Sequence, residues 1–281
     1  MKSGFEIPVF GFGGWEIGGS RERNPNSDDQ ADIAGIKYAL QSGITHFDTA
    51  EKYAQGHSEE LIGEAIKGFG RSKLFLVSKV QKTHLRPEDL INSLKQTLHR
   101  LQTDYLDMYL IHSHSPVIPI QESMGAMDEA VSKGLIKNMG VSNFTVDELK
   151  EAQKATKNKI VCNQVYYNLT FRLPEKDGML EYCQQNDVIL TAWRPIERGI
   201  LARNGIKILD DMAKKYDKTP AQIAINWLIS QPNVVTISKM QKQSHVDENL
   251  GAIGWALAAE DIELLRNEFP GQISDYDLVQ W

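Results

Sequence analysis

Short apolar runs alternate with longer stretches in which apolar residues recur at helical spacing, and this pattern holds along most of the chain. The apolar runs lie at about residues 43–48, 74–78, 106–111, 137–141, 160–163, 188–192 and 234–237, and the helical stretches at about 58–67, 87–100, 120–132, 146–156, 175–186, 205–216 and 219–230. Short apolar runs without alternation are typical of strands that are buried on both faces. Repeated strand and helix units predict a parallel sheet covered by helices.

The first part of the chain has a different pattern. Residues 2–9 alternate apolar and polar positions after a Ser3-Gly4 turn, which predicts a small β-hairpin. The first strand of the sheet then follows at 9–13. The polar stretch 18–26 predicts a mobile loop that precedes a helix capped within Ser27-Asp28-Asp29.

Ionisable side chains follow successive strand-like runs. Asp48 ends the first run, Tyr53 lies in the loop after it, and Lys79 and His112 directly follow the next two runs. In parallel α/β folds the carboxyl ends of the strands form one rim, and the chemistry is placed there. We therefore expect these four side chains to meet at one rim.

These four residue types suit proton transfer. A phenol in water has a pKa of about 10, so Tyr53 is a poor proton donor at neutral pH unless a nearby cation favours its ionised form. Lys79 can supply that cation, and the carboxylate of Asp48 can keep a buried lysine charged. Taken singly, Lys79 or His112 is more simply a polar cap where a strand leaves the core, but four such residues at successive strand ends favour a site.

Composition and charge narrow the functional classes. The 281 residues are long enough for one large core, and we expect residues 1–281 to form a single domain. The net charge of −6 and the lack of a basic block argue against nucleic acid or an anionic membrane as a partner. Cys162 and Cys183 are the only cysteines, which fits unpaired thiols in a reducing compartment. No run has the length of a membrane span or the form of a signal peptide, so we expect a cytoplasmic protein.

Several short motifs occur in an order and spacing that resemble the aldo-keto reductase family over nearly the whole chain. They are Phe47-Asp48-Thr49-Ala50 with Tyr53 and Gly56-His57-Ser58-Glu59; Leu101-Gln102-Thr103-Asp104-Tyr105-Leu106-Asp107 through Ile111-His112; Gly134-Leu135-Ile136-Lys137 through Gly140-Val141-Ser142-Asn143-Phe144; and Asn163-Gln164-Val165. Each motif alone is weakly specific. The resemblance implies an α/β fold, a single-domain (β/α)8 TIM barrel whose floor is closed by the N-terminal β-hairpin.

The resemblance also implies an activity. The chain would be an NAD(P)H-dependent oxidoreductase that reduces a small-molecule aldehyde or ketone to an alcohol, with the cofactor bound without a Rossmann domain. Tyr53 would protonate the carbonyl oxygen and His112 would orient the carbonyl group. Lys79 would lower the pKa of Tyr53, and Asp48 would anchor Lys79.

Further strand ends carry residues that suit a nicotinamide. Ser142 and Asn143 end one run and Gln164 ends the next, and such groups can bond the nicotinamide amide, which both donates and accepts hydrogen bonds. The family uses matching residues in this way, although the same residues also serve as helix caps and strand ends. Trp193 matches a position where the family places an aromatic ring against the nicotinamide, although a buried tryptophan is more often part of a core.

The loop after Trp193 contains Arg194, Pro195, Ile196, Arg198 and Gly199. We hypothesise that Arg194 or Arg198 contacts the cofactor pyrophosphate, because a guanidinium group pairs well with phosphate oxygens. Gly14, Trp15, Leu201 and Ser238 complete the residues that we expect around the cofactor.

The last segment bears on the choice between the two nicotinamide cofactors. Family members that use the phosphorylated cofactor typically have Lys-Ser, an arginine six residues after the lysine, and then Glu-Asn. This chain has Lys239-Met240, His245 and Glu248-Asn249. Lys239 can meet a 2′-phosphate and Asn249 the adenine, whereas Met240 lacks the hydroxyl and an imidazole loses its charge near pH ~6.5. The resemblance favours NADP(H), with NAD(H) as the alternative.

Residues at the expected cavity mouth bear on the substrate. Trp15 ends the first strand and should line the mouth beside Tyr53 and His112. Many relatives carry tryptophan after the catalytic histidine, whereas this chain has Ser113, which predicts a wider and more polar pocket. The tail after Pro270, with Tyr276 and Trp281, either folds over the opening or is a surface segment without a role; because it is short, we expect permissive substrate recognition. We expect a monomer, since no exposed apolar stripe is evident.

Two other functions remain open at this stage. In a metal-dependent hydrolase barrel, His112 and His114 would be two metal ligands on either side of Ser113, but matching histidine or carboxylate ligands at other strand ends are missing, and we expect no metal site. In a redox-sensing subunit, the reductase fold would keep its cofactor without turnover. Fold alone does not settle this choice.

Overall fold

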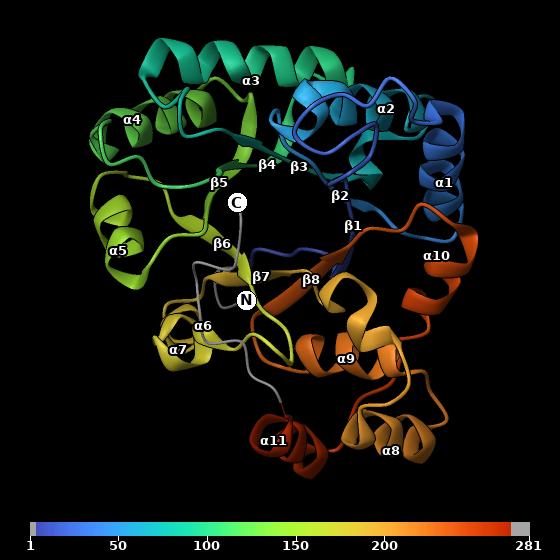
Figure 1. Ribbon diagram of the computed structural model, residues 1–281. Helices are drawn as coiled ribbons and strands as arrows, with labels where there is room; N and C mark the ends of the chain where they lie inside the picture. The colour runs from blue at the N-terminus through green and yellow to red at the C-terminus, as the bar shows by residue number, and fades with distance from the viewer. Residues whose placement is uncertain (1–3, 271–281) are drawn as a thin grey trace.

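The computed structural model describes residues 4–270. Eight parallel strands follow one another in chain order and close into a barrel, with the helices arranged around it (Figure 1). The first strand also pairs with the last, with Phe10 opposite Thr236, so the sheet has no free edge. The (β/α)8 TIM barrel predicted from the sequence is therefore confirmed.

The strands are β1 (Phe10–Gly13), β2 (His46–Asp48), β3 (Phe75–Val80), β4 (Leu106–Ile111), β5 (Ile136–Ser142), β6 (Ile160–Tyr166), β7 (Ile189–Trp193) and β8 (Val234–Ser238). The helices are α1 (Asp29–Gln41), α2 (His57–Ala65), α3 (Pro87–Leu101), α4 (Ile120–Ser132), α5 (Val146–Lys154), α6 (Leu173–Lys176), α7 (Met179–Gln185), α8 (Lys207–Tyr216), α9 (Pro220–Ile229), α10 (Gln243–Leu250) and α11 (Ala259–Glu268). Three short 3-10 turns, η1 (Tyr53–Gly56), η2 (Arg71–Lys73) and η3 (Glu197–Ala202), lie between them.

Local signals in the sequence fix where several helices begin and end. Asp28 caps α1, its carboxylate accepting from the backbone N–H of Ala31 at 3.0 Å. Proline opens α3 and α9 at the first turn, where its missing N–H costs no hydrogen bond. The single helix expected at 175–186 is instead two, α6 and α7, because the chain turns at Gly178 with a φ of +78°. Among the helices of the described residues, none has the length and hydropathy needed to span a membrane.

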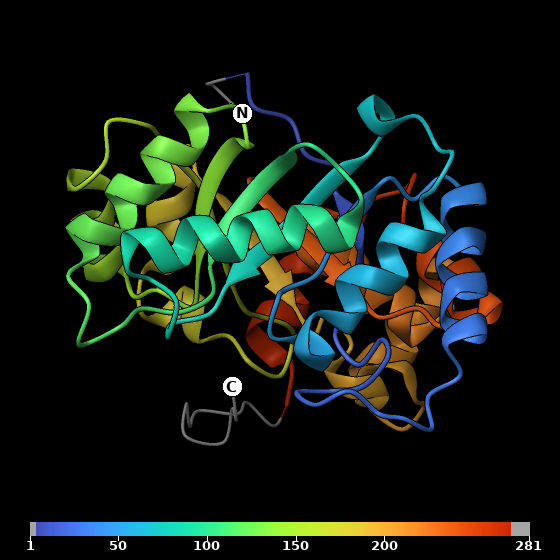
Figure 2. The ribbon, with the colours of Figure 1, turned by 90° about the horizontal axis from the view of Figure 1, so that it is seen from above.

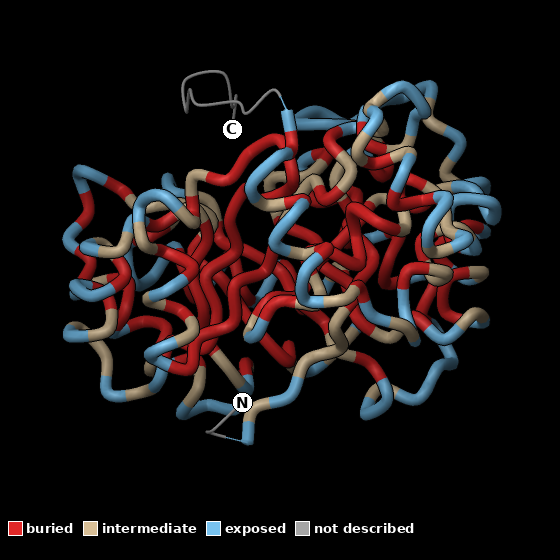
Figure 3. The backbone as a smooth tube through the Cα atoms, turned by 90° about the horizontal axis from the view of Figure 1, so that it is seen from below, coloured by how far each residue is buried: buried red, intermediate tan, exposed pale blue. Residues whose placement is uncertain are grey.

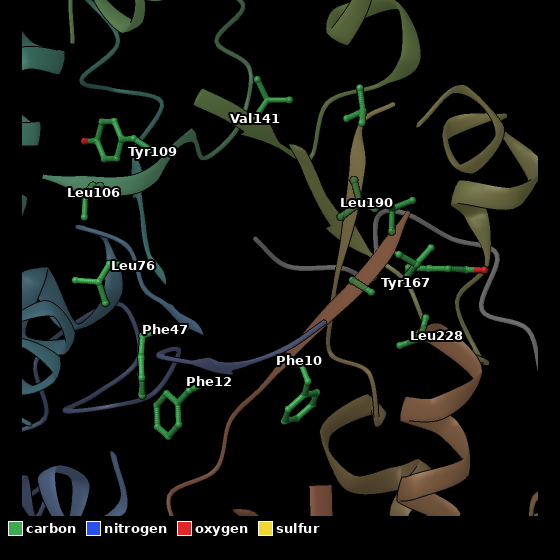
Figure 4. Packing of buried hydrophobic residues seen from close by; sticks show 14 of the residues in the cluster. Phe10, Phe12, Phe47, Leu76, Leu106, Tyr109, Val141, Tyr167, Leu190 and Leu228 are labelled. Atoms are coloured by element: carbon green, nitrogen blue, oxygen red, sulfur yellow. The ribbon is translucent and has the colours of Figure 1, made fainter. Parts of the chain in front are cut away.

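The core has two apolar layers, and buried residues fill the strands at the centre of the molecule (Figure 3). The larger layer lies between the strands and the helices and includes Phe47, Leu76 and Leu106 (Figure 4). The smaller one includes Val77 and Leu110 and fills the inside of the barrel. Because successive side chains of a strand point to opposite faces, each strand contributes to both layers.

The segment 4–9 closes the floor of the barrel, but it contains no strand. The expected β-hairpin was therefore wrong for these residues, and residues 1–3 lie outside the described part of the chain. Pro8 has no backbone N–H to offer a hairpin ladder. Instead, Phe5 and Ile7 pack against the apolar cluster inside the barrel. Figure 2 shows this dark-blue segment at one end of the barrel and the loop between β1 and α1 at the other.

Candidate active site

The inward face of the barrel changes from apolar to polar toward the carboxyl ends of the strands. On β3, Val77 lies in the interior cluster, and Lys79, two residues further, shares its face. In the same way His112 follows Leu110 on β4. Asp48 ends β2, next to β3 in the sheet. The strand pattern therefore places these polar groups in one layer above the apolar interior.

The buried ion pair of Lys79 and Asp48 forms the floor of the site. The Lys79 ammonium donates to Asp48 Oδ1 at 2.5 Å and to the carbonyl of Thr49 at 2.8 Å. The side chains of Lys79 and Asp48 are 0% and 1% exposed, so water does not screen their charges. The other carboxylate oxygen accepts from Gln164 Nε2 at 2.8 Å. Both oxygens of the carboxylate are thus satisfied from inside the barrel.

The ammonium of Lys79 also reaches Tyr53, which sits above it in η1. Lys79 Nζ lies 3.5 Å from the Tyr53 hydroxyl. The tyrosine ring is held by edge contacts with Trp15, at 5.0 Å between ring centroids, and with His112, at 5.7 Å. The structure therefore brings together Asp48, Tyr53, Lys79 and His112.

The charges of these groups follow from burial and from their partners. Burial lowers the pKa of Lys79, but the charge and hydrogen bond of Asp48 and the contact with Tyr53 outweigh it, so the pKa is raised and the lysine stays charged. Burial raises the pKa of Tyr53, and the charge of Lys79 offsets this only in part. Lys79 thus lowers the pKa of Tyr53, as expected from the sequence, but burial has the larger effect and the pKa remains raised. Tyr53 keeps its proton at neutral pH.

His112 is neutral. Burial and then the positive charges of Lys79 and Lys52 hold its pKa well below the ordinary value of histidine. Its Nδ1 is buried without a hydrogen-bond partner, which leaves Nε2 as the nitrogen that can meet a ligand.

A cavity of about 600 Å³ opens above this group. Of the residues predicted from the sequence, it is lined by Gly14, Trp15, Asp48, Tyr53, His112, Ser142, Asn143, Gln164, Trp193, Arg194, Pro195, Ile196, Arg198, Gly199, Ser238, Lys239, His245, Glu248 and Asn249. Leu201 and Met240 do not line it, because both side chains are 0% exposed in the core. Their assignment to the cofactor site is corrected accordingly. Ser113, expected at the substrate, is not among the lining residues either.

An aromatic stack forms one wall of the cavity. The ring of Trp193 is stacked on Tyr166 at 4.5 Å, and Tyr166 is stacked on Phe171 at 4.1 Å. Trp193 Nε1 donates to Asn143 Oδ1 at 3.2 Å, which fixes the orientation of the indole. One ring face of Trp193 is therefore covered by protein, and the residue still lines the cavity.

The amide and hydroxyl groups expected at the nicotinamide are already partly engaged. The Ser142 hydroxyl donates to the carbonyl of Gln164 at 2.8 Å, and Asn143 Nδ2 donates to the carbonyl of His112 at 3.1 Å. Gln164 uses its Nε2 on Asp48. These residues hold one another and the ion pair as well as lining the cavity.

The loop after β7 is anchored by the buried carboxylate of Glu197. Glu197 Oε2 accepts from the Tyr166 hydroxyl and, at 2.8 Å, from Asn168 Nδ2. Arg194, Glu197 and Arg198 have φ angles of +58°, +44° and +52°, a conformation that is uncommon for residues other than glycine. This anchor holds the turn that brings both arginines to the cavity.

Cationic and polar side chains gather where β8 ends. Lys239 pairs with Glu16 at 3.0 Å, a contact that joins the loops after β8 and β1. Asn249 is buried, and its Nδ2 lies 3.4 Å from Ser238 Oγ. His245 is exposed at the edge of the cavity.

The turn that carries Tyr53 is held by the loop before α1. Ala54 and Gln55 have φ angles of +48° and +57°. The N–H of Ala54 donates to the carbonyl of Ser20 at 2.7 Å, and Gln55 Nε2 donates to Glu22. The 18–26 stretch, expected as a mobile loop, therefore contacts the turn and supports the position of Tyr53.

His112 and His114 do not converge on one point. His114 Nδ1 faces Glu148 of α5 at 3.3 Å, and its ring contacts Phe144. Within residues 4–270 no group of three or more histidine, cysteine or carboxylate side chains is placed to hold a metal ion. The structure gives no support to the hydrolase alternative.

Sequence reasoning missed Gly13, Glu16, Lys52, Ala202, Ile237 and Gln241, which also line the cavity. Lys52 and Glu16 each neighbour a residue that was predicted, Tyr53 and Trp15, so adjacency in the rim loops was a usable signal. No local signal marked Ala202 or Gln241.

Comparisons with known proteins agree with this geometry. The model of the Aldo/keto reductase family matches residues 9–267. The chain is 32% identical to methylglyoxal reductase of Escherichia coli K12, covering 94% of this chain and 92% of that protein. It is also 32% identical to glyoxal reductase of Bacillus subtilis, covering 94% and 89%.

Solved structures are similar as well. A thermostable aldo-keto reductase crystallised with the inhibitor epalrestat has a TM-score of 0.91 and 47% identity, over 94% of this chain and 96% of that one. An aldo-keto reductase from Klebsiella pneumoniae in complex with NADPH has a TM-score of 0.84 and 33% identity, over 96% and 93%.

Removing one partner of the buried pair should be costly. Asp48→Asn leaves the ammonium of Lys79 without its counter-ion, and we expect the free energy of unfolding to fall by about 3–5 kcal/mol. Asp48→Asn with Lys79→Met should lose less than the sum of the two single changes, because the stranded charge is gone. Urea unfolding measures both. Asp211→Asn, which breaks the exposed pair with Lys207, is the control and should cost under about 1 kcal/mol. Additive effects at Asp48 and Lys79 would contradict the account.

Proposed function

The chain belongs to the aldo/keto reductase family, and from that premise we propose that it reduces small aldehydes and ketones to alcohols in the cavity above Tyr53. It is an NADP(H)-dependent oxidoreductase of this family. The observation that carries the residue assignment is the charged, buried Lys79, which bonds Asp48 and reaches the Tyr53 hydroxyl.

The cavity fits a nicotinamide cofactor at its inner end. Trp193 offers an aromatic ring backed by Tyr166, and Ser142, Asn143 and Gln164 offer hydrogen-bonding groups beside it. When bound there, the reduced nicotinamide supplies a hydride to the carbonyl carbon. Trp193 would keep one face of the nicotinamide ring away from water.

The outer part of the cavity fits the phosphates. Arg198 and Lys239 line it and can pair with phosphate oxygens. Lys239 would then leave its ion pair with Glu16 and bind a phosphate instead. Asn249 would bond the adenine, and His245, which lines the same cavity, would bond a phosphate oxygen. These assignments agree with the preference for NADP(H). Arg194 remains a second candidate for the pyrophosphate.

Tyr53 would be the proton donor. Its pKa is raised by burial, so the hydroxyl is protonated at neutral pH and can give its proton to the oxygen of the carbonyl group. The transfer leaves a phenolate 3.5 Å from the ammonium of Lys79, which stabilises the negative charge. Asp48 holds Lys79 in place and in its charged form.

His112 would orient the substrate. It is neutral, and its ring packs edge-on against Tyr53 at 5.7 Å between centroids. A neutral imidazole with a proton on Nε2 donates one hydrogen bond to the carbonyl oxygen without competing as an acid. Trp15 also packs edge-on against Tyr53 and would exclude water from the carbonyl group.

The proposal also covers the size of the substrate, the oligomeric state of the protein and its compartment. The relatives named methylglyoxal reductase and glyoxal reductase support a small carbonyl compound as substrate. Residues 1–281 would act as one domain and as a monomer in the cytoplasm, without a nucleic-acid partner. The exposed large hydrophobic side chains of the described residues lie on separate elements, and Cys162 and Cys183 are unpaired, which supports this state.

The assignment of Tyr53 is tested by Tyr53→Phe, which removes the hydroxyl and keeps the ring. We expect the rate constant for reduction to fall by about 10² to 10⁴, because the proton donor is lost. Consumption of NADPH and NADH over aromatic, aliphatic and sugar aldehydes measures it. Tyr182→Phe, remote on α7, is the matched control and should behave as wild type. A Tyr53→Phe protein with near-normal turnover would refute the assignment, and wild-type cofactor binding without any turnover would favour the redox-sensing subunit.

The phosphate assignments predict that His245 contributes to the cofactor preference. His245 lines the cavity, and its imidazole can bond a phosphate oxygen. We therefore expect His245→Asn to weaken the preference for NADPH over NADH severalfold. Dissociation constants for both cofactors, measured by quenching of tryptophan fluorescence, give the ratio in each protein. An unchanged ratio in His245→Asn would count against His245.

A further inference from the structure

Lys52 is a half-buried lysine at the substrate end of the cavity. It directly precedes Tyr53, lines the cavity together with Tyr53 and His112, and its charge helps to keep His112 neutral. Within residues 4–270 no carboxylate lies within ion-pair distance of its ammonium group. The adjacent Glu51 is turned away, since its carboxylate accepts from the N–H of Gln81 at 2.7 Å and faces His84.

The surroundings of Lys52 are positive rather than negative. Burial, and then the charges of Arg21 and Lys82, lower its pKa. The net charge of the whole chain is −6, so this local excess of positive charge runs against the average of the molecule. A partly desolvated cation among like charges is stabilised when an anion binds beside it.

Arg194 lines the same cavity and adds a second positive charge that acts on Tyr53. Its guanidinium carbon lies 5.0 Å from the ring centroid of Trp193 and 5.6 Å from that of Tyr166. The two rings are stacked 4.5 Å apart, so a group this close to both lies beside the stack, not over the outer face of Trp193. The charge of Arg194 also lowers the pKa of Tyr53, although burial outweighs it.

The other lysine that lines the cavity is a useful contrast. Lys239 has a counter-ion, because Glu16 lies 3.0 Å from its ammonium group. Lys239 thus has a partner within the protein, whereas Lys52 is placed to take its partner from a ligand.

We propose that Lys52 forms an anion-binding subsite that receives a carboxylate on the carbonyl substrate. This inference rests on the proposed function, since it names the substrate class of the same cavity: oxo-acids and aldehydes that bear a carboxylate, in preference to neutral carbonyl compounds of the same size. Lys52 binds the carboxylate while Tyr53 and His112 engage the carbonyl oxygen. The substrate is thereby held at two points.

The test compares two aldehydes that differ in charge and little in size, 4-carboxybenzaldehyde and methyl 4-formylbenzoate, each with saturating NADPH. The ester is the more electrophilic aldehyde, so intrinsic reactivity works against the expected result. We expect wild type to have the higher kcat/KM for the acid. Lys52→Met should lower kcat/KM for the acid about tenfold, mainly by raising KM. The kcat/KM for the ester should change less than twofold. A tenfold change corresponds to about 1.4 kcal/mol. Lys52→Arg should keep the preference for the acid.

Two controls separate charge at the site from other effects. Lys95→Met makes the same change at an exposed lysine of α3 and should leave both substrates unaffected. If Lys52→Met does not fold, the ratio of acid to ester in wild type decides, because it should fall severalfold as salt is raised from about 20 to 500 mM.

The inference is overturned if wild type does not prefer the acid, if the ratio does not depend on salt, or if Lys52→Met lowers acid and ester equally. In these cases the ester is still reduced, and the proposed function stands. If neither aldehyde is reduced although the cofactor binds, the proposed function itself fails, and this inference fails with it.

Discussion

The ammonium group of Lys79 has no contact with water, and the rest of the site depends on the carboxylate that keeps it charged. An isolated charge in that position would lower the free energy of unfolding by about 3–5 kcal/mol, a large part of the stability of a domain, so the carboxylate of Asp48 beside it is essential. The pair requires β2 and β3 to be neighbours, and its second oxygen requires Gln164 from β6. A closed barrel meets both conditions, because it brings distant strands to face one another across a narrow interior (Figure 1).

The groups that would carry the reaction lie above this ion pair, toward the opening of the cavity. The hydroxyl of Tyr53 lies next to the ammonium group of Lys79. The tyrosine is held in place by aromatic contacts and by the turn whose backbone bonds the carbonyl of Ser20. The cavity above is walled by the stack ending at Trp193 on one side. The loop anchored by buried Glu197 carries the arginines on another. Lys79, Lys52 and Arg194 therefore place positive charge around the group that transfers the proton. This arrangement suits a reaction in which negative charge develops on oxygen.

The sequence predicted what depends on short-range patterns and missed what depends on packing across the barrel. The strand runs predicted that Lys79 and His112 lie at one rim, and the capping residues Ser27-Asp28-Asp29 predicted the start of α1. The bond from Gln164 to Asp48 joins residues 116 apart and has no local signal. Met240 was placed at the cofactor by a motif, but the core closes over its side chain. Helix α10 was missed because its buried positions are too few to form an apolar stripe.

The charge of Lys79 tests this account most directly. In protein labelled with ¹⁵N at the lysine side chain, the Nζ resonance of Lys79 is identified by its loss in Lys79→Met and followed from pH 6 to 10. The account predicts that it keeps the shift of an ammonium group throughout, because Asp48 raises the pKa above the ordinary lysine value. In Asp48→Asn, Lys79 should lose its proton at a pH between 6 and 10. A Lys79 that loses its proton below pH 9 in the wild-type protein would contradict the account.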